Sequence, residues 1–393
     1  MTSLWVRYSV GLLLFAMVAM ACKHPLPVSA DVLPDKPKRD SIVRLPPGTS
    51  PHTMFRCSVK DKDGNLWFGT TGAGIYKFES GNFVRYAELD GLTNTIVYQM
   101  TYDARGRLWV ATDEGIFFME KDKFYALKMP EIKHTVSGNP AQLQMEAHKT
   151  RWQIYCLTWD KDGNLWFGTE KEGLWCYHDG IFTNYRFINN EFVVVADTMT
   201  KVPRQAFIHA LSTDQQGRVW MSGYDAPFAY VENGALHTMN VDYLKHVPHK
   251  NVKGYVSSTM HVFQMVYDAN GILWMSTRDD GLCKWDGQTV TSYTEANGLT
   301  DNSSSCICPT ADGRIWIGSL GKAGARGDGI KGLWVMENEV ITAIPSDGLR
   351  NRDVWTVIDD RDGNIWIGTK EFGLFKYDGT TFTEMSSLPQ TTE

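Results

Sequence analysis

Histidine has the widest chemical scope of the residue types in this sequence, because a neutral imidazole can bind a metal ion or act as a general base. His246 and His249 stand in the segment "HVPH", and His261 follows further along the chain. No cysteine or carboxylate stands beside them at a familiar metal-ligand spacing, and Pro248 breaks helical geometry. We therefore predict no metal site, no cofactor and no catalytic residue, and keep these three histidines as the candidate ligands should a metal bind.

A second set of candidates shares one position in a recurring pattern. Eight residues before the glycine of each of seven tight turns, the chain mostly carries an aromatic, imidazole or cationic side chain. Flat side chains with polar tips suit sugar rings, peptide side chains or heterocycles. The alternative is that they only pack between repeat units. The candidate ligand-binding residues at this position are Arg56, Tyr98, Tyr155, His209, Phe263 and Trp355.

Charged residues gather in the short segments that follow the recurring tryptophans. These side chains could hold hydroxyl or charged groups of a ligand, although any one of them could instead belong to a solvated turn. The candidates of this kind are Glu172, Asp225, Arg278, Asp280 and Glu371.

The turn glycines belong to an internal repeat. "KDGNLWFGT" stands at 62–70 and again at 161–169, and "RDGNIWIGT" stands at 361–369. An aspartate precedes the turn glycine by three positions in every unit but the sixth, where Thr310 stands. The tryptophans that follow are 42 to 57 residues apart, which is the period of a four-stranded propeller blade with insertions. The anchors are Trp67, Trp109, Trp166, Trp220, Trp274, Trp316 and Trp366.

Each unit reads as four short strands. Asp-Gly turns between aromatic and β-branched runs are strong hairpin signals. We predict an all-β protein, a seven-bladed β-propeller of four-stranded antiparallel blades over residues 41–390, with a tryptophan between each pair of blades. Two ways of closing the ring remain open. "TTFTEM" at the carboxyl end completes the seventh unit by itself, whereas "SIVRL" at 41–45 resembles "FVRY" at 83–86 and could instead add to the outer edge of that unit.

Four insertions are expected on one face of the ring. Three lie between the last strand of one unit and the first strand of the next, within residues 130–151, 187–205 and 241–259, and one lies at 320–332 between the second and third strands of unit six. In an antiparallel blade both kinds of connection leave the same end. Long loops over one mouth of a rigid ring usually carry the binding site.

The amino terminus is typical of a targeting segment. Arg7 is followed by the apolar run "GLLLFAMVAMA" and then Cys22, which predicts a lipoprotein signal peptide over 1–21, lipidation of Cys22 and a flexible tether over 22–40. A plain secretory signal cut near Ala21 or Ala30 is the alternative. Both place the mature chain outside the cytoplasm, at the bacterial cell envelope, with a membrane contact only through the lipid.

Composition excludes other partners. The formal charge is −6 and no long Lys/Arg run is present, so nucleic acid is not expected as a partner. Cys57, Cys156 and Cys306 share one strand position in non-adjacent units and cannot pair with each other. We expect the cysteines beyond Cys22 to be buried small side chains.

"DxxGNLWFGT" followed by a Gly-Leu-x-x-Tyr pattern, as in "EGLWCYHDG" and "FGLFKYDGT", resembles the two-component regulator propeller repeat over about residues 55–386. The resemblance implies an extracytoplasmic sensor propeller, yet no kinase or DNA-binding module accompanies it. We therefore expect a lipoprotein that binds a small molecule or glycan, or an envelope signalling or transport protein, and acts with a separate transducer. Two alternatives remain: an enzyme that uses the propeller mouth, lyase or hydrolase and possibly metal-dependent, and an envelope scaffold.

Overall fold

Each repeat unit folds into four short antiparallel strands in which consecutive strands pair, as the spacing of the Asp-Gly turns predicts. The computed structural model describes residues 44–45, 53–130, 152–170, 172–188, 191–195, 207–224, 226, 228–239, 261–300, 302–319, 332–345, 348–349, 353–370 and 373–385. In this part of the chain no helix is long and apolar enough to cross a membrane. The predicted signal peptide, Cys22, the tether, His246 and His249 lie outside the described residues.

The strands of the first three blades are β2 (Phe55–Lys60), β3 (Leu66–Thr70), β4 (Ile75–Glu79) and β5 (Asn82–Tyr86); β6 (Val97–Tyr102), β7 (Leu108–Thr112), β8 (Gly115–Glu120) and β9 (Lys123–Ala126); and β10 (Ile154–Trp159), β11 (Leu165–Thr169), β12 (Leu174–His178) and β13 (Ile181–Ile188).

Blades four to seven comprise β15 (Phe207–Thr213), β16 (Val219–Tyr224), β17 (Ala229–Glu232) and β18 (Ala235–Thr238); β19 (Val262–Tyr267), β20 (Leu273–Thr277), β21 (Leu282–Trp285) and β22 (Val290–Tyr293); β23 (Cys306–Pro309), β24 (Ile315–Gly318), β25 (Leu333–Glu337) and β26 (Val340–Ala343); and β27 (Val354–Asp359), β28 (Ile365–Thr369), β29 (Leu374–Tyr377) and β30 (Phe382–Glu384). Two short 3-10 turns are η2 (Glu88–Asp90) and η4 (Glu295–Asn297).

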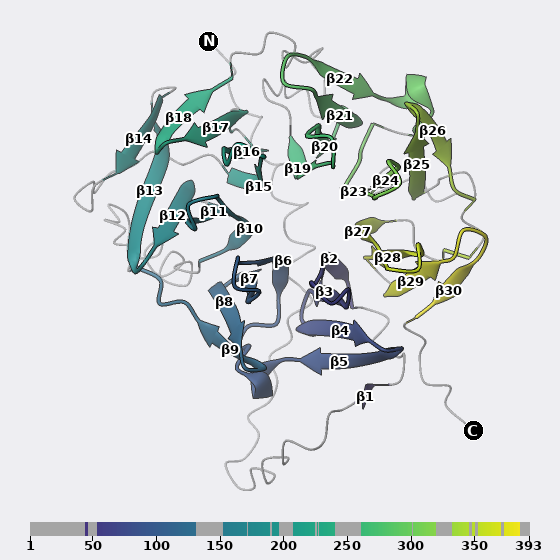
Figure 1. Ribbon diagram of the computed structural model, residues 1–393, viewed down its shortest axis with the longest axis horizontal. Coiled ribbons are helices and arrows are strands. Elements are labelled where there is room, and N and C mark those ends of the chain that lie inside the picture. The colour runs from purple at the N-terminus through teal and green to yellow at the C-terminus, as the bar shows by residue number, and fades with distance from the viewer. Residues whose placement is uncertain are drawn as a thin grey trace, which may run out of the picture. The chain divides into compact units, whose positions relative to one another are not determined.

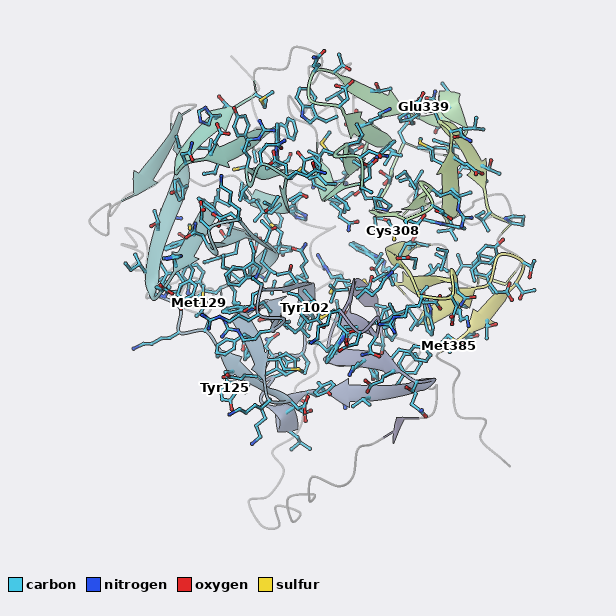
Figure 2. All side chains as sticks on the ribbon, viewed as in Figure 1. Tyr102, Tyr125, Met129, Cys308, Glu339 and Met385 are labelled. Atoms are coloured by element: carbon cyan, nitrogen blue, oxygen red, sulfur yellow. The ribbon has the colours of Figure 1, made fainter. Side chains whose placement is uncertain are left out.

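The seven blades form a ring in which the first strand of each blade lies innermost and contacts the first strand of the next (Figure 1). The predicted seven-bladed propeller is therefore confirmed. Side chains fill the spaces between blades, and Cys308 of β23 lies nearer the centre than Glu339 at the tip of the outer hairpin (Figure 2). Seven buried apolar clusters occupy the seven interfaces, and each contains the anchor tryptophan of one blade with side chains of the next. Trp366, for example, packs with Phe55 and Phe68 of blade one.

The recurring aspartate ties each turn to its tryptophan. In blade three, Asp160 Oδ1 accepts the backbone N–H groups of Asp162 and Asn164 at 3.0 and 2.9 Å, and its Oδ2 accepts Trp166 Nε1–H at 2.8 Å. Blade six has Thr310 instead, and there the buried Trp316 Nε1 has no hydrogen-bond partner among the described residues. The same bond to the tryptophan is made by Asp61, Asp103, Asp214, Asp268 and Asp360.

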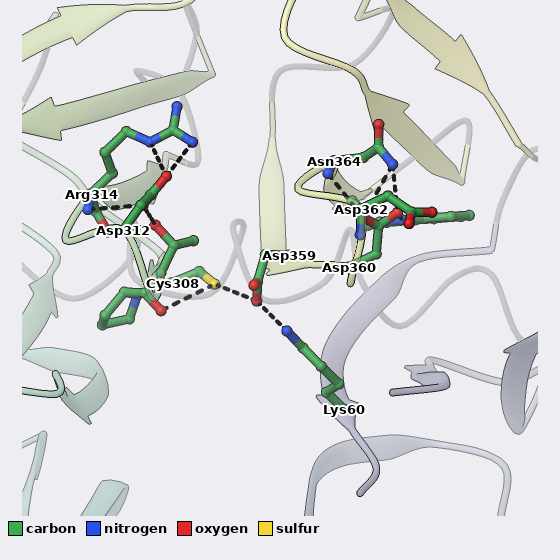
Figure 3. A network of polar contacts seen from close by, with 11 residues as sticks. Lys60, Cys308, Asp312, Arg314, Asp359, Asp360, Asp362 and Asn364 are labelled. Carbon is green, nitrogen blue, oxygen red and sulfur yellow. Dashed lines mark hydrogen bonds and ion pairs between the residues drawn. The ribbon is translucent and has the colours of Figure 1, made fainter. Parts of the chain in front are cut away.

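The carboxyl-terminal strand β30 pairs with β29 and completes blade seven within its own repeat, which is the first of the two predicted closures. Residues Arg44–Leu45 form β1, which pairs with β5 of blade one, so the proposal that this segment joins the seventh blade is wrong. Blades seven and one meet through their inner strands: Lys60 Nζ contacts Asp359 Oδ1 at 2.7 Å, and Cys308 Sγ reaches the same carboxylate from blade six (Figure 3).

The strand order confirms that the insertions follow β9, β13, β18 and β24. Within the second insertion, Glu191–Val195 forms β14, a fifth strand on the edge of blade three. The remainder of the insertions lies outside the described residues.

All six described cysteines are free, and five of them are buried, as predicted.

Candidate functional site

Six of the seven inner strands carry a register irregularity at the predicted ligand-binding residue. The shifts fall between the neighbours of that residue in every case, as with Phe55 and Cys57 around Arg56. A β-bulge places an extra residue in one strand and re-aims its side chain. The bulged residues are Arg56, Tyr98, Tyr155, His209, Phe263 and Trp355. In blade six, the residue at this position is the buried Ser305, which precedes the strand and donates to the carbonyl oxygen of Val354.

The bulges bring these side chains together at the centre of the ring. The Arg56 guanidinium carbon lies 4.3 Å from the Tyr98 ring centroid, 5.3 Å from that of Trp355 and 5.8 Å from that of Tyr155. Arg56 belongs to blade one and Tyr155 to blade three, and these blades are not adjacent. Their contact therefore requires both side chains to project toward the axis. We call Arg56, Tyr98, Tyr155, His209, Phe263 and Trp355 the axial cluster; each of them is half-buried.

The cluster continues as a chain of ring contacts through blades two to five. The ring centroids of Tyr98 and Tyr155 are 4.4 Å apart, and the Tyr155 and His209 rings stack at 5.0 Å. His209 then meets Phe263 at 6.2 Å in an edge-on arrangement. The site residues that share the bulge position are thus brought together as a continuous series of flat side chains, three of which contact the Arg56 cation.

Sequence reasoning missed Phe207 as part of this surface. Its ring lies 3.9 Å from that of His209 and 4.5 Å from that of Tyr155. His261, predicted only as a metal candidate, also contacts His209, with centroids 5.5 Å apart. Both residues lie two positions before a bulged residue, so the period-two alternation of a strand could have indicated them.

The imidazoles at the axis are neutral at neutral pH. Burial lowers the pKa of His209 to about 3, and electrostatic repulsion from a protonated His261 and from Arg56 lowers it further. Burial also lowers the pKa of His261 to about 4, with a further contribution from Arg278. Burial lowers the pKa of Arg56 too, but a guanidinium stays charged in a protein. The axial cluster therefore holds one permanent positive charge.

The predicted loop residues behave differently from one another. Arg278 is exposed, and its backbone N–H donates to the carbonyl oxygen of His261 at 3.0 Å, which places it next to the cluster. Glu172 is buried and pairs with Arg186 of β13 at 2.6 Å, so it braces its own blade. Asp280 is buried in a turn of blade five, where its N–H donates to Thr277 Oγ1 at 3.0 Å. Asp225 and Glu371 lie outside the described residues.

Among the described residues, no group of three or more His, Cys, Asp or Glu side chains is arranged to hold a metal ion. The chemistry that the described site offers is recognition: stacking on aromatic faces, hydrogen bonding by neutral imidazole and phenol groups, and attraction of an anion by Arg56.

A family model described as the two component regulator propeller matches the chain at 49–72, 91–114, 153–171, 298–321 and 348–371. Five of the seven units therefore carry the two-component regulator propeller repeat. Each match spans the first two strands of a blade, in blades one, two, three, six and seven, and together the matches confirm the resemblance read from the "GNLWFGT" pattern. No curated protein matches the sequence.

Solved structures of several activities share the fold. The extracellular domain of a hybrid two component system from B. thetaiotaomicron is 19% identical with a TM-score of 0.59, over 85% of this chain and 40% of that one. Virginiamycin B lyase from Staphylococcus aureus is 14% identical with a TM-score of 0.58, over 84% of this chain and 97% of that one. This chain thus spans about two fifths of the length of the first structure, and identities this low establish the propeller architecture alone.

Proposed function

We propose that this regulator propeller is an extracytoplasmic binding protein with a sensory or accessory role, that the axial cluster is its ligand site, and that a separate protein transduces the signal. The observation that carries the proposal is the convergence of bulged side chains from six blades on the axis. A ring of half-buried aromatic faces around a cation offers stacking surfaces and a polar anchor, which suits a glycan or one of its fragments. The same repeat family and the extracellular B. thetaiotaomicron domain support the sensory role and the envelope location.

A propeller-mouth enzyme is the second candidate, because two imidazoles, His209 and His261, meet at the axis and a lyase shares the fold. Their pKa values near 3 and 4 make both of them weak bases at pH 7. Binding by neutral imidazoles is therefore better supported than proton abstraction.

Thermal-shift screening of the full-length chain tests the binding role. The panel holds glycan oligosaccharides, peptides and divalent metals, and the variants are Tyr155→Ala and Trp355→Ala. A ligand at 100 times its dissociation constant should stabilise the unaltered chain by about 2.7 kcal/mol, and both variants should lose most of that gain. Tyr125→Ala, which changes a 47% exposed tyrosine on the outer strand of blade two (Figure 2), should retain it.

Each other outcome has a defined meaning. A stabilisation that survives in both axial variants contradicts the axial site. A shift with a metal alone favours the enzyme. If no small molecule stabilises the chain, the ligand-binding proposal fails, and a protein partner becomes the better hypothesis.

A further inference from the structure

Arg56 differs from the other described cations that lie over aromatic rings. Each of the others also has a carboxylate partner within 2.5 to 2.8 Å. These pairs are Lys77 with Glu79, Arg107 with Asp103, Arg218 with Asp214, Lys284 with Glu339, and Arg314 with Asp312. Arg56 makes only its ring contacts: among the described residues no carboxylate and no hydrogen-bond acceptor partners its guanidinium.

The half-buried surroundings of Arg56 make the lack of a described carboxylate partner energetically unfavourable. The Arg56 side chain is half-buried and has therefore lost part of its hydration, which lowers its pKa. Ring faces attract a cation, yet they leave the N–H groups of the guanidinium without acceptors. A partly desolvated charge gains most from an opposite charge that arrives with hydrogen-bond acceptors.

The nearby protein acids do not supply that charge. Asp113 and Glu170 raise the pKa of Tyr98, and among the described residues neither of them forms an ion pair with Arg56. The exposed Arg278 beside His261 adds a second cation to the far side of the axis. Among the described residues, the axis therefore offers an anion a guanidinium without a carboxylate partner, next to aromatic walls.

We propose that the axial site takes a ligand that carries a carboxylate, which forms with Arg56 the ion pair that no described carboxylate makes. This inference rests on the proposed function and names the chemical class of its ligand. A carboxylate matches the fork of a guanidinium with two parallel hydrogen bonds. One guanidinium balances a monoanion. Tyr98 and Trp355, whose rings flank the guanidinium, would pack against the body of the ligand.

Two sources of this carboxylate, an acidic sugar and a peptide carboxyl terminus, can be separated by calorimetric titration of the full-length chain. One matched pair of probes is galacturonate and its uncharged methyl ester, and the other is N-acetylphenylalanine and its amide. In at least one pair the acid should bind about 10-fold or more tightly than its neutral counterpart, since hydrogen bonds to charged groups are the stronger ones. The pair that discriminates identifies the source.

Variants of Arg56 test whether this residue causes the preference for the acid probe over its neutral counterpart. Arg56→Gln should remove the difference between acid and neutral probe, and Arg56→Lys, which keeps the charge without the fork, should retain part of it. Arg218→Gln is the matched control, because Arg218 also lies over aromatic rings but already has Asp214 as its partner, and it should leave the discrimination unchanged.

The proposal is overturned if acid and neutral probes bind equally, if the preference survives in Arg56→Gln, or if no acid probe binds. Should a neutral ligand stabilise the chain through Tyr155 and Trp355 while no acid binds, the carboxylate inference fails and the proposed function stands. Should no small molecule bind at all, both fail.

Discussion

At the residue scale, the aspartate of the repeat explains why its tryptophan recurs so regularly. Asp160 uses both carboxylate oxygens, one on the backbone of the turn and one on the indole N–H of Trp166. The turn and the inter-blade core are thus fixed by one side chain. Blade six is the exception, since Thr310 bonds to Asp312 at 2.6 Å and leaves Trp316 Nε1 without a partner among the described residues.

Restoring the aspartate should therefore stabilise blade six. Thr310→Asp is expected to raise the free energy of unfolding by about 1 kcal/mol, because the buried Trp316 Nε1–H gains an acceptor. Asp160→Ala should lower it by about 1–3 kcal/mol, and Asp162→Ala, an exposed residue of the same turn, should change it far less. Thermal melts of the full-length variants measure these changes. A loss of stability in Thr310→Asp would contradict the role assigned to the aspartate.

At the element scale, the second strand of a blade must lie close to the first strand of its own and of the next blade. A Cβ atom on Gly69 of β3 would lie 2.5 Å from Cys57 Sγ and 2.5 Å from Val97 Cγ1. Blade two has Ala111 at the same position, and its first strand carries Gln99 where blade one has Cys57. The residue on one strand is thus matched to the residue on its neighbour.

Gly69→Ala should lower the free energy of unfolding by about 1–3 kcal/mol through overpacking. Cys57→Ala removes the Sγ atom, one of the two atoms that would clash with the new Cβ. The double variant Gly69→Ala/Cys57→Ala should therefore be more stable than the sum of the two single losses predicts. Ala111→Gly, the reverse change where the space already exists, should cost only about 1 kcal/mol. Strictly additive losses in Gly69→Ala and Cys57→Ala would show that the two strands are not coupled at this point.

At the element scale, some features of the site can be predicted from the repeat pattern, whereas others depend on how the strands pair. Alignment of the repeats found the six axial positions, because they keep a fixed distance to the turn glycine. It did not reveal that each is a bulge, since a bulge depends on hydrogen-bond register between two strands and leaves no composition signal. Nor did it show that Glu172 is engaged by Arg186, because that ion pair joins residues of different strands.

At the scale of the whole molecule, the described strands close the ring with each blade built from its own repeat. Blades one and seven meet through Ser58 and Thr356, whose hydroxyl oxygens are 2.6 Å apart, and through Lys60 and Asp359. Trp366 of blade seven packs against Phe68 of blade one with ring centroids 5.8 Å apart. The closing interface is thus of the same kind as the other six.

Proline substitutions distinguish the two terminal strands. Thr383→Pro removes a donor from the middle of β30 at an exposed position, and it should cost about 3 kcal/mol because the outer strand of blade seven depends on that pairing. Changing both Arg44 and Leu45 to proline should cost less than about 1 kcal/mol, since β1 adds two residues to an already complete blade. Thermal melts compare the two. A larger loss from the β1 variant would assign ring closure to the amino-terminal segment.

The sequence by itself determined the number of blades, the strands of each blade and the tryptophan that fills each interface, because these depend on turn chemistry and on a period that recurs within one unit. Only the tertiary structure decided which side chains meet at the axis and which cation there lacks a carboxylate partner in the described part of the chain. Arg56 touches residues from blades two, three and seven, and such contacts arise only when the ring has closed. Local sequence sets the geometry of a blade, whereas the charge balance at the axis depends on side chains that are far apart along the chain.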